Sequence, residues 1–196
     1  MNKQLIISFD DIRESCDRWE AFEKLFQEFP EIKITFFVIT EKSDSEYFKK
    51  IKTKNTELVF HSWEHSGHWL DWSVEQAKEW LLKYQQYGFE KGFKAPGWKL
   101  TDNIRTACKE LGFWICSSPT IPVDIKQYWY TYPQEGFREY EQYIEFYDHV
   151  EHRHYDGKQW IEDEHVFFDN LEKLKQYCRE NKPNFKFITE VLKTHE

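Results

Sequence analysis

The chain has 196 residues, with 35 acidic against 27 basic side chains and a formal net charge of −8. Nucleic-acid-binding surfaces are normally basic, so this balance excludes that class of partner. The four cysteines, Cys16, Cys108, Cys116 and Cys178, show neither CxxC nor zinc-ribbon spacing and are interpreted as free thiols of a reducing compartment. No apolar run approaches the ~18 residues of a membrane span, and the first residues lead directly into a predicted strand, which leaves no room for a signal peptide. We therefore expect one cytoplasmic domain, residues 1–196, that binds neither nucleic acid nor membrane.

Strands and helices are predicted to alternate along most of the chain. Apolar and β-branched runs predict seven strands, at residues 4–9, 33–40, 57–60, 92–95, 113–117, 143–147 and 184–189. Capping residues and helical spacing of apolar side chains predict helices at about residues 17–29, 43–52, 73–88, 101–111 and 164–180. The predicted caps are a capping box at Asp17 and Glu20, Ser43 or Ser45, a capping box at Ser73 and Gln76, and Thr101, with Gly112 as the stop after residue 111. Residues 118–142 contain three prolines and no clear period, and are interpreted as an irregular excursion. This order predicts an α/β fold with a mainly parallel sheet covered by helices, as a closed or nearly closed β/α barrel or an open doubly wound sheet.

Two histidines follow the third predicted strand in the segment His61-Ser62-Trp63-Glu64-His65. A spacing of four residues places both imidazoles on one side of a helical turn, which suits two ligands of one metal ion. Imidazole is a preferred ligand of zinc and its first-row neighbours. The alternative is a pair of exposed histidines at the end of a strand.

Two adjacent carboxylates, Asp10 and Asp11, follow directly after the first predicted strand and offer one metal ligand and one base. Ligands gather at the carboxyl ends of parallel strands in barrels and in open sheets alike. We therefore expect one group of side chains to converge at that edge: Asp10, Asp11, His61, His65, Lys94 and His149.

Three motifs in this order resemble those of the polysaccharide deacetylases of the NodB-homology type, carbohydrate esterase family 4. Ser8-Phe9-Asp10-Asp11 is similar to the first motif, Thr-Phe-Asp-Asp, and the histidine segment to the second, His-(Ser/Thr)-x-x-His. Lys94-Ala95-Pro96-Gly97-Trp98 resembles the third, with lysine where arginine is usual. His149 resembles the histidine of the fifth motif, with His152 and His154 as competitors. No stretch matches the fourth motif, for which Asp124 and Trp129 are loose candidates.

The resemblance covers about residues 4–190 and implies a single NodB-like domain. It implies a deformed β/α barrel of about seven mainly parallel strands wrapped by helices. It also implies a metal-dependent hydrolase that removes an N-acetyl or related acyl group from a carbohydrate. The expected cofactor is a divalent metal, first of all Zn²⁺, with Co²⁺, Ni²⁺ or Mn²⁺ as alternatives.

The resemblance also implies roles for individual residues. Asp11, His61 and His65 would be the metal ligands, Asp10 the catalytic base and His149 the general acid. Lys94 would lie against Asp10 and hold it ionised. Substrate contacts are assigned to Pro96, Trp98 and Trp63, with core packing as the alternative for the tryptophans.

Because of Lys94 and the missing fourth motif, the alternative function is a catalytically silent NodB-like barrel that binds sugar or metal without turnover. A hydrolase of another bond, such as an ester or a cyclic amide, is a third possibility. The sugar, the metal and the oligomeric state stay open.

Overall fold

The computed structural model describes residues 4–16, 18–41, 43–64, 67–117, 127–129, 136–140 and 143–193. The strands are β1 (Gln4–Ile12), β2 (Ile34–Ile39), β3 (Thr56–Ser62), β4 (Phe89–Lys94), β5 (Trp114–Ser117), β6 (Gln127–Trp129), β7 (Gly136–Glu139), β8 (Tyr143–His149), β9 (Arg153–Tyr155), β10 (Trp160–Glu162) and β11 (Asn184–Lys186). The α-helices are α1 (Trp19–Glu28), α2 (Ser45–Ile51), α3 (Val74–Gln85), α4 (Asp102–Leu111), α5 (Glu164–Asn181) and α6 (Ile188–Lys193). Two short 3-10 helices are η1 (His68–Asp71) and η2 (Pro96–Trp98). None of the described helices is both long and apolar enough to span a membrane.

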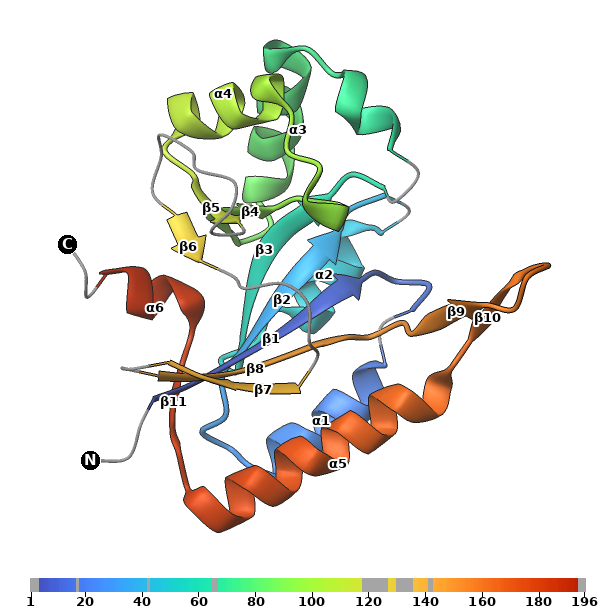
Figure 1. The fold of residues 1–196 in the computed structure, drawn as a ribbon. Coiled ribbons are helices and arrows are strands. Elements are labelled where there is room, and N and C mark those ends of the chain that lie inside the picture. Colours follow the sequence, from blue (N-terminus) through green and yellow to red (C-terminus); the bar gives the residue numbers. More distant parts are fainter. Residues whose placement is uncertain are drawn as a thin grey trace.

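Among the described residues the main sheet has nine strands, and seven of them form one parallel series in the order β6-β5-β4-β3-β2-β1-β8. β7 lies antiparallel to β8, and β11 runs parallel to the first residues of β1. A doubly wound sheet reverses its strand order at a switch point, whereas here β1 to β6 follow one another around the sheet and β8 returns to β1. The sheet is curled and wrapped by helices (Figure 1), and among the described residues no pairing joins β6 to β7. The prediction of a deformed β/α barrel of about seven mainly parallel strands is confirmed.

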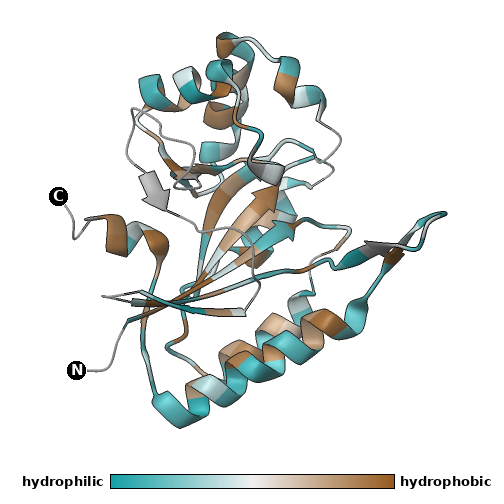
Figure 2. Ribbon diagram, in the orientation of Figure 1, coloured by the Kyte–Doolittle hydropathy of each residue, from teal (hydrophilic) through white to brown (hydrophobic). Residues whose placement is uncertain are grey.

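Alternate side chains of the strands enter two different cores. From β1, Leu5, Ile7 and Phe9 join the cluster that includes the buried faces of the helices α1, α3, α4 and α5. Ile6 instead joins an inner cluster formed with side chains from the other strands and from α6. Both faces of the sheet are therefore covered, which explains why its strands read as nearly continuous apolar runs. Figure 2 shows these strands as the hydrophobic centre of the molecule, with hydrophilic residues on the outer faces of the helices.

Several helix ends form as the sequence predicts. Ser73 and Gln76 make a capping box at α3, Thr101 caps α4, and Gly112 ends α4 in the left-handed region, at φ 71°. Two other predicted caps are wrong. The N-cap of α2 is Asp44, whose side chain accepts a hydrogen bond from the Tyr47 amide, and not one of the flanking serines. The N-cap of α1 is Arg18, which makes no side-chain capping bond, and Asp17 of the predicted capping box lies outside the described residues.

The predicted strand at residues 184–189 is too long. β11 ends at Lys186 and the chain turns into α6, because the Phe187 amide donates to the carboxylate of Glu190 at 2.8 Å and starts a helical turn. Helical spacing then directs apolar side chains of α6 into the inner cluster, namely Ile188, Val191 and Leu192. The segment predicted to be irregular contains the short strands β6 and β7, and the hairpin of β9 and β10 was not predicted.

Gly92 of β4 pairs with Trp114 of β5, and the indole lies across its backbone. A Cβ atom at position 92 would stand 2.3 Å from ring atoms Cε2 and Cζ2 of Trp114. Gly92→Ala therefore forces the indole or the strand to move, and we expect the free energy of unfolding to fall by about 1–3 kcal/mol. Urea denaturation measures this loss. The same substitution in a Trp114→Leu background should cost clearly less, and an equal cost in both backgrounds would contradict the steric explanation.

Candidate active site

The first two candidate residues lie in a bulge at the end of β1. β1 has one residue more than β2 here, as the register shows: Phe9 pairs with Phe36, and Ile12 with Val38. Asp11 is the extra residue of the bulge. Its backbone lies in the left-handed region, at φ 67°, a conformation that aspartate tolerates better than most residues. Neighbouring side chains of a regular strand point to opposite faces. The bulge instead allows both carboxylates to approach one imidazole, with Asp10 Oδ2 at 3.8 Å and Asp11 Oδ1 at 3.4 Å from His61 Nε2.

Asp10 is held by a buried ion pair with Lys94 from the end of β4. Both side chains are almost fully buried, and Lys94 Nζ lies 2.9 Å from Oδ1 and 2.8 Å from Oδ2 of Asp10. Burial is the largest influence on the pKa of Asp10 and raises it. Lys94, with contributions from His61 and His149, outweighs burial and holds the pKa below its ordinary value. Asp10 is therefore a carboxylate at neutral pH, as the predicted role of Lys94 requires.

His61, at the end of β3, is oriented by the main chain of β4. Its Nδ1 lies 2.9 Å from the carbonyl oxygen of Lys94. A carbonyl only accepts hydrogen bonds, so Nδ1 carries a proton and donates it. In the neutral ring the lone pair is then on Nε2, the atom that faces Asp10 and Asp11. A backbone carbonyl that fixes the tautomer in this way is a frequent second partner of metal-binding histidines.

Asp11 and His61 fit two positions around one metal ion. Asp11 Oδ1 and His61 Nε2 lie 3.4 Å apart. Two ligands that are each about 2.1 Å from a zinc ion and form a tetrahedral angle are separated by about 3.4 Å. His65, the third predicted ligand, lies outside the described residues. Among the residues that are described, no group of three histidine, cysteine, aspartate or glutamate side chains is arranged to hold a metal.

His149, at the end of β8, reaches the same centre through Tyr147. Asp10 and His149 are register partners in the β1–β8 pairing. The Tyr147 hydroxyl donates to Asp10 Oδ2 at 3.0 Å and lies 2.8 Å from Nε2 of His149. His149 Nε2 is 3.9 Å from Asp10 Oδ2, and the side chain of His149 remains 30% exposed. An imidazole that is open to solvent yet close to a buried carboxylate suits the transfer of a proton to a ligand.

His152 and His154 are the other two candidates for the histidine of the fifth motif, and the structure does not place either of them beside Asp10. His152 Nε2 lies 2.9 Å from Asp148 Oδ1, and Asp148 also accepts a hydrogen bond from Asn170 of α5. Asp148 neighbours Tyr147 and His149 in β8, so strand alternation directs it to the opposite face, toward α5. The side chain of His154 lies outside the described part of the structure.

The predicted substrate residues stay predictions. Pro96 is buried at the start of η2, directly after the strand that carries Lys94, and the side chain of Trp98 is not among those described. Trp63 is half-buried, contacts Trp72 with ring centroids 5.8 Å apart, and packs against the helix-side core. Of the candidates for the missing fourth motif, Asp124 lies outside the described residues and the side chain of Trp129 is not described.

Sequence reasoning missed two aromatic residues of the site. Tyr147 was interpreted only as part of a strand, and Phe37 only as part of an apolar run. Lys94 Nζ lies 4.1 Å from the ring centroid of Tyr147 and 4.8 Å from that of Phe37, so the two rings flank the buried ammonium group. A signal for Tyr147 was present, because it stands two residues before His149 and strand alternation places both on one face.

A sequence profile described as "Polysaccharide deacetylase" matches residues 1–115, more than half of the chain. The chain belongs to the polysaccharide deacetylase family. The matched region contains Asp10, Asp11, His61, His65 and Lys94, whereas Tyr147 and His149 lie beyond it. No curated protein matches the chain in sequence.

Two solved structures share the fold of this chain. The first is the Xyl-CE4 domain of a multidomain xylanase from the hindgut metagenome of Trinervitermes trinervoides, with a TM-score of 0.61, 14% identity, and coverage of 100% of this chain and 92% of that one. The second is the Bc1960 peptidoglycan N-acetylglucosamine deacetylase, with a TM-score of 0.60, 14% identity, and coverage of 95% of this chain and 86% of that one. At this identity the likeness establishes the fold and not the substrate.

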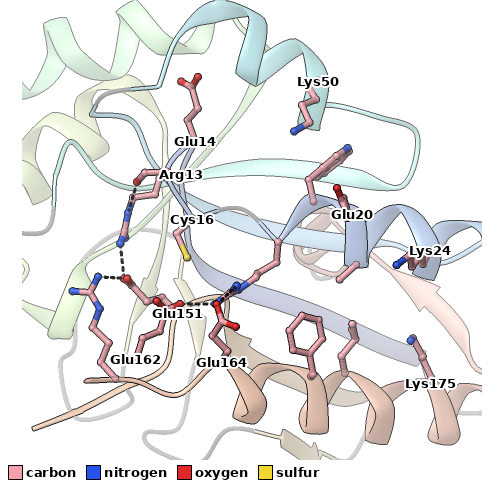
Figure 3. A pocket seen from close by; sticks show the side chains of 17 residues that line it. Arg13, Glu14, Cys16, Glu20, Lys24, Lys50, Glu151, Glu162, Glu164 and Lys175 are labelled. Carbon is pink, nitrogen blue, oxygen red and sulfur yellow. Dashed lines mark hydrogen bonds and ion pairs between the residues drawn. The ribbon is translucent and has the colours of Figure 1, made fainter. Parts of the chain in front are cut away.

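A cleft of about 980 Å³ lies beside the carboxyl ends of β1 and β8 (Figure 3). Its described lining comes from the β1–α1 connection, from α1, α2 and α5, and from the segment after β8, and it includes none of Asp10, Lys94 and His149. Ion pairs cross it: Arg13 pairs with Glu151 at 2.5 Å, and Arg18 with Glu162 and with Glu164. These contacts attach the late part of the chain, which carries His149, to the part that carries Asp10.

Replacing Lys94 should make stability depend on pH in a new way. In the wild type, Asp10 with its lowered pKa stabilises the folded protein, and this contribution is lost only as pH falls through the folded-state pKa. Lys94→Met removes the charge, so burial then raises the pKa of Asp10, and stability is lost as pH rises through that raised value. We expect metal-free Lys94→Met to be less stable than the wild type by about 3–5 kcal/mol near pH 7.5.

The deficit should shrink near pH 4.5, where Asp10 in the variant is protonated. Urea unfolding at the two pH values measures the difference. Lys99→Met, at an exposed lysine five residues away, is the control and should unfold like the wild type at both. A deficit in Lys94→Met that does not change with pH would show that the charge of Lys94 is not what stabilises ionised Asp10.

Proposed function

We propose that this polysaccharide deacetylase is a metal-dependent hydrolase that removes an N-acetyl or related acyl group from a carbohydrate. The observation that carries the proposal is the position of Asp10 between two imidazoles. Its Oδ2 lies 3.8 Å from Nε2 of His61 and 3.9 Å from Nε2 of His149. Lys94 and Tyr147 fix the carboxylate in that position. A base, a candidate metal ligand and a candidate acid thus share one small volume at the carboxyl ends of the strands.

Asp11, His61 and His65 would hold the divalent cation. When bound, such an ion supplies Lewis-acid activation of water and of a substrate carbonyl. The distance of 3.4 Å between Asp11 Oδ1 and His61 Nε2 supports this assignment. So does the hydrogen bond from Nδ1 of His61 to the carbonyl oxygen of Lys94, which leaves Nε2 facing Asp11. Zn²⁺ suits a mixed carboxylate and imidazole site best, and Co²⁺, Ni²⁺ and Mn²⁺ are the alternatives.

Asp10 would act as the general base that takes a proton from the attacking water. Its lowered pKa keeps it ionised, and its burial excludes competing solvent. His149 would act as the general acid that gives a proton to the leaving nitrogen, because an amine leaves poorly as an anion. Each such proton transfer contributes about 10²–10⁴-fold in rate.

Lys94 would support turnover although arginine is usual at this position in the family. Its ammonium group contacts both oxygens of Asp10. The substitution therefore preserves the charge and the contact, and one motive for the silent alternative is weakened. Pro96, Trp98 and Trp63 are our proposal for carbohydrate contacts, and the cytoplasm is our proposal for location.

The direct test is acetate release from N-acetylated amino sugars and their oligomers. Protein stripped of metal should release none, and protein reloaded in turn with Zn²⁺, Co²⁺, Ni²⁺ and Mn²⁺ should regain release with at least one ion. Acetate is measured enzymatically, and bound metal by elemental analysis. Tight metal binding without release from any N-acetylated or O-acetylated sugar would favour the silent barrel instead.

Single substitutions should separate metal binding from proton transfer. Asp11→Ala and His61→Ala should each lose the metal, whereas Asp10→Asn should retain it and lower turnover by about 10²–10⁴-fold. His68→Ala is the matched control, because His68 is exposed and close in sequence to the predicted ligands. It should retain both metal and activity. Loss of metal in Asp10→Asn, or its retention in both Asp11→Ala and His61→Ala, would contradict the assigned roles.

A further inference from the structure

The cleft beside the carboxyl ends of β1 and β8 continues outward along the β9–β10 hairpin. Pairing of the two strands places Glu162 opposite Arg153, so that both lie on one face of the hairpin, and both line the cleft. Trp160 stands two residues before Glu162 in β10, and strand alternation therefore places it on the same face. The hairpin projects from the body of the protein beyond β8 (Figure 1). One face thus leads from the cleft to Trp160.

Two aromatic side chains lie exposed on this surface. Trp160 is 67% exposed, and Phe168, which lines the cleft from α5, is 44% exposed. Arg18 lies between the hairpin and Phe168. Its guanidinium group pairs with Glu162 and Glu164, and its Cζ lies 6.0 Å from the ring centroid of Phe168. Exposed apolar residues that are scattered singly need no ligand, whereas two exposed aromatic rings along one hollow indicate a binding surface.

The chemistry of the lining fits a neutral ligand that is rich in hydroxyl groups. Six basic and five acidic side chains are among the described lining residues, so the cleft favours an ion of neither sign. Guanidinium groups donate hydrogen bonds and carboxylates accept them, as sugar hydroxyls require. An aromatic face carries partial negative charge and attracts the C–H groups of a sugar ring. With about 980 Å³, the cleft is at the upper end of the range of about 300–1,000 Å³ for small-molecule sites.

The cleft begins next to the proposed catalytic centre. Arg13 stands two residues after Asp11, and Glu151 stands two residues after His149. Arg13 and Glu151 pair with each other at 2.5 Å, and both line the cleft. A glycan chain that leaves the catalytic centre on this side therefore meets the cleft with its next units.

We propose that the cleft and this hairpin face form a second carbohydrate-binding surface, on which Phe168 and Trp160 hold sugar units that lie beyond the unit being deacetylated. The inference rests on the proposed function and adds to it a surface outside the catalytic centre that none of the sequence motifs includes. Phe168 and Trp160 bind the chain and take no part in the hydrolysis.

The test compares the hexamer of N-acetylglucosamine with the monomer. Trp160→Ala and Phe168→Ala each remove one ring, and Trp160→Tyr and Phe168→Tyr retain an aromatic face. Leu82→Ala is the matched control, because Leu82 is 54% exposed on α3 and does not line the cleft. Binding is measured by isothermal titration calorimetry with metal-free protein, so that the sugars stay acetylated. Turnover is measured as acetate release by metal-loaded protein, and thermal unfolding shows that each variant is folded.

Each alanine variant should bind the hexamer about 3- to 10-fold more weakly than the wild type, which is the effect of losing one aromatic contact. In acetate release, KM for the hexamer should rise by the same factor and kcat should stay unchanged, because these contacts are equal in the ground state and the transition state. Values for the monomer should not change. The tyrosine variants should stay within about twofold of the wild type, and Leu82→Ala should match it.

Equal hexamer affinity in the wild type and in the double variant Trp160→Ala/Phe168→Ala would overturn the proposal. So would a wild type that does not bind the hexamer, or an equal loss for monomer and hexamer. A dimer in light scattering that Trp160→Ala dissociates would assign the surface to a second copy of the chain and overturn it as well. A wild type that binds the hexamer through these rings but releases acetate from no acetylated sugar refutes the proposed function and leaves the second surface in place.

Discussion

The buried ion pair between Asp10 and Lys94 is the interaction on which the arrangement of the site depends. Removing two charges from water costs several kcal/mol per ion, and a buried pair persists only where its geometry recovers that cost. Here the ammonium group contacts both carboxylate oxygens and is flanked by the rings of Phe37 and Tyr147. The backbone carbonyl of Lys94 also orients His61. One residue at the end of β4 therefore fixes both the base and a candidate metal ligand.

At the opposite end of the strands, α6 covers the inner face of the sheet. α6 directs Ile188, Val191 and Leu192 into the inner cluster, next to the first residues of β1. Glu57 is also buried near the end of the strands that α6 covers. Burial raises the pKa of Glu57, although the hydroxyl groups of Thr35 and Thr189 donate hydrogen bonds to its carboxylate. Apolar side chains of α6 thus pack at one end of the strands, and the charged groups of the site lie at the other end.

The strand order alone predicts that polar residues such as Asp10, His61 and Lys94 lie close together, but not how their side chains are arranged. Polar residues at strand ends converge because parallel strands share a carboxyl edge, and this required only the strand order. The bulge that brings Asp10 and Asp11 to one imidazole depends on pairing between β1 and β2, which a single strand does not reveal. Tyr147 has the spacing of a core residue, and only the register of β8 against β1 shows that its hydroxyl meets Asp10. The last predicted strand is partly a helix for a related reason, since the contacts of α6 with the inner cluster outweigh the β preference of that segment.

Lysine at position 94 and tyrosine at position 147 together account for how Asp10 is held. An arginine presents two parallel N–H donors, and so fixes both the distance and the plane of a carboxylate. A lysine ammonium is a point charge that lies between the two oxygens here and leaves the carboxylate plane less constrained. The Tyr147 hydroxyl donates to Oδ2 from β8 and supplies that second direction. The departure from the family's arginine and the tyrosine two residues before His149 are therefore parts of one arrangement, in which charge comes from β4 and orientation from β8.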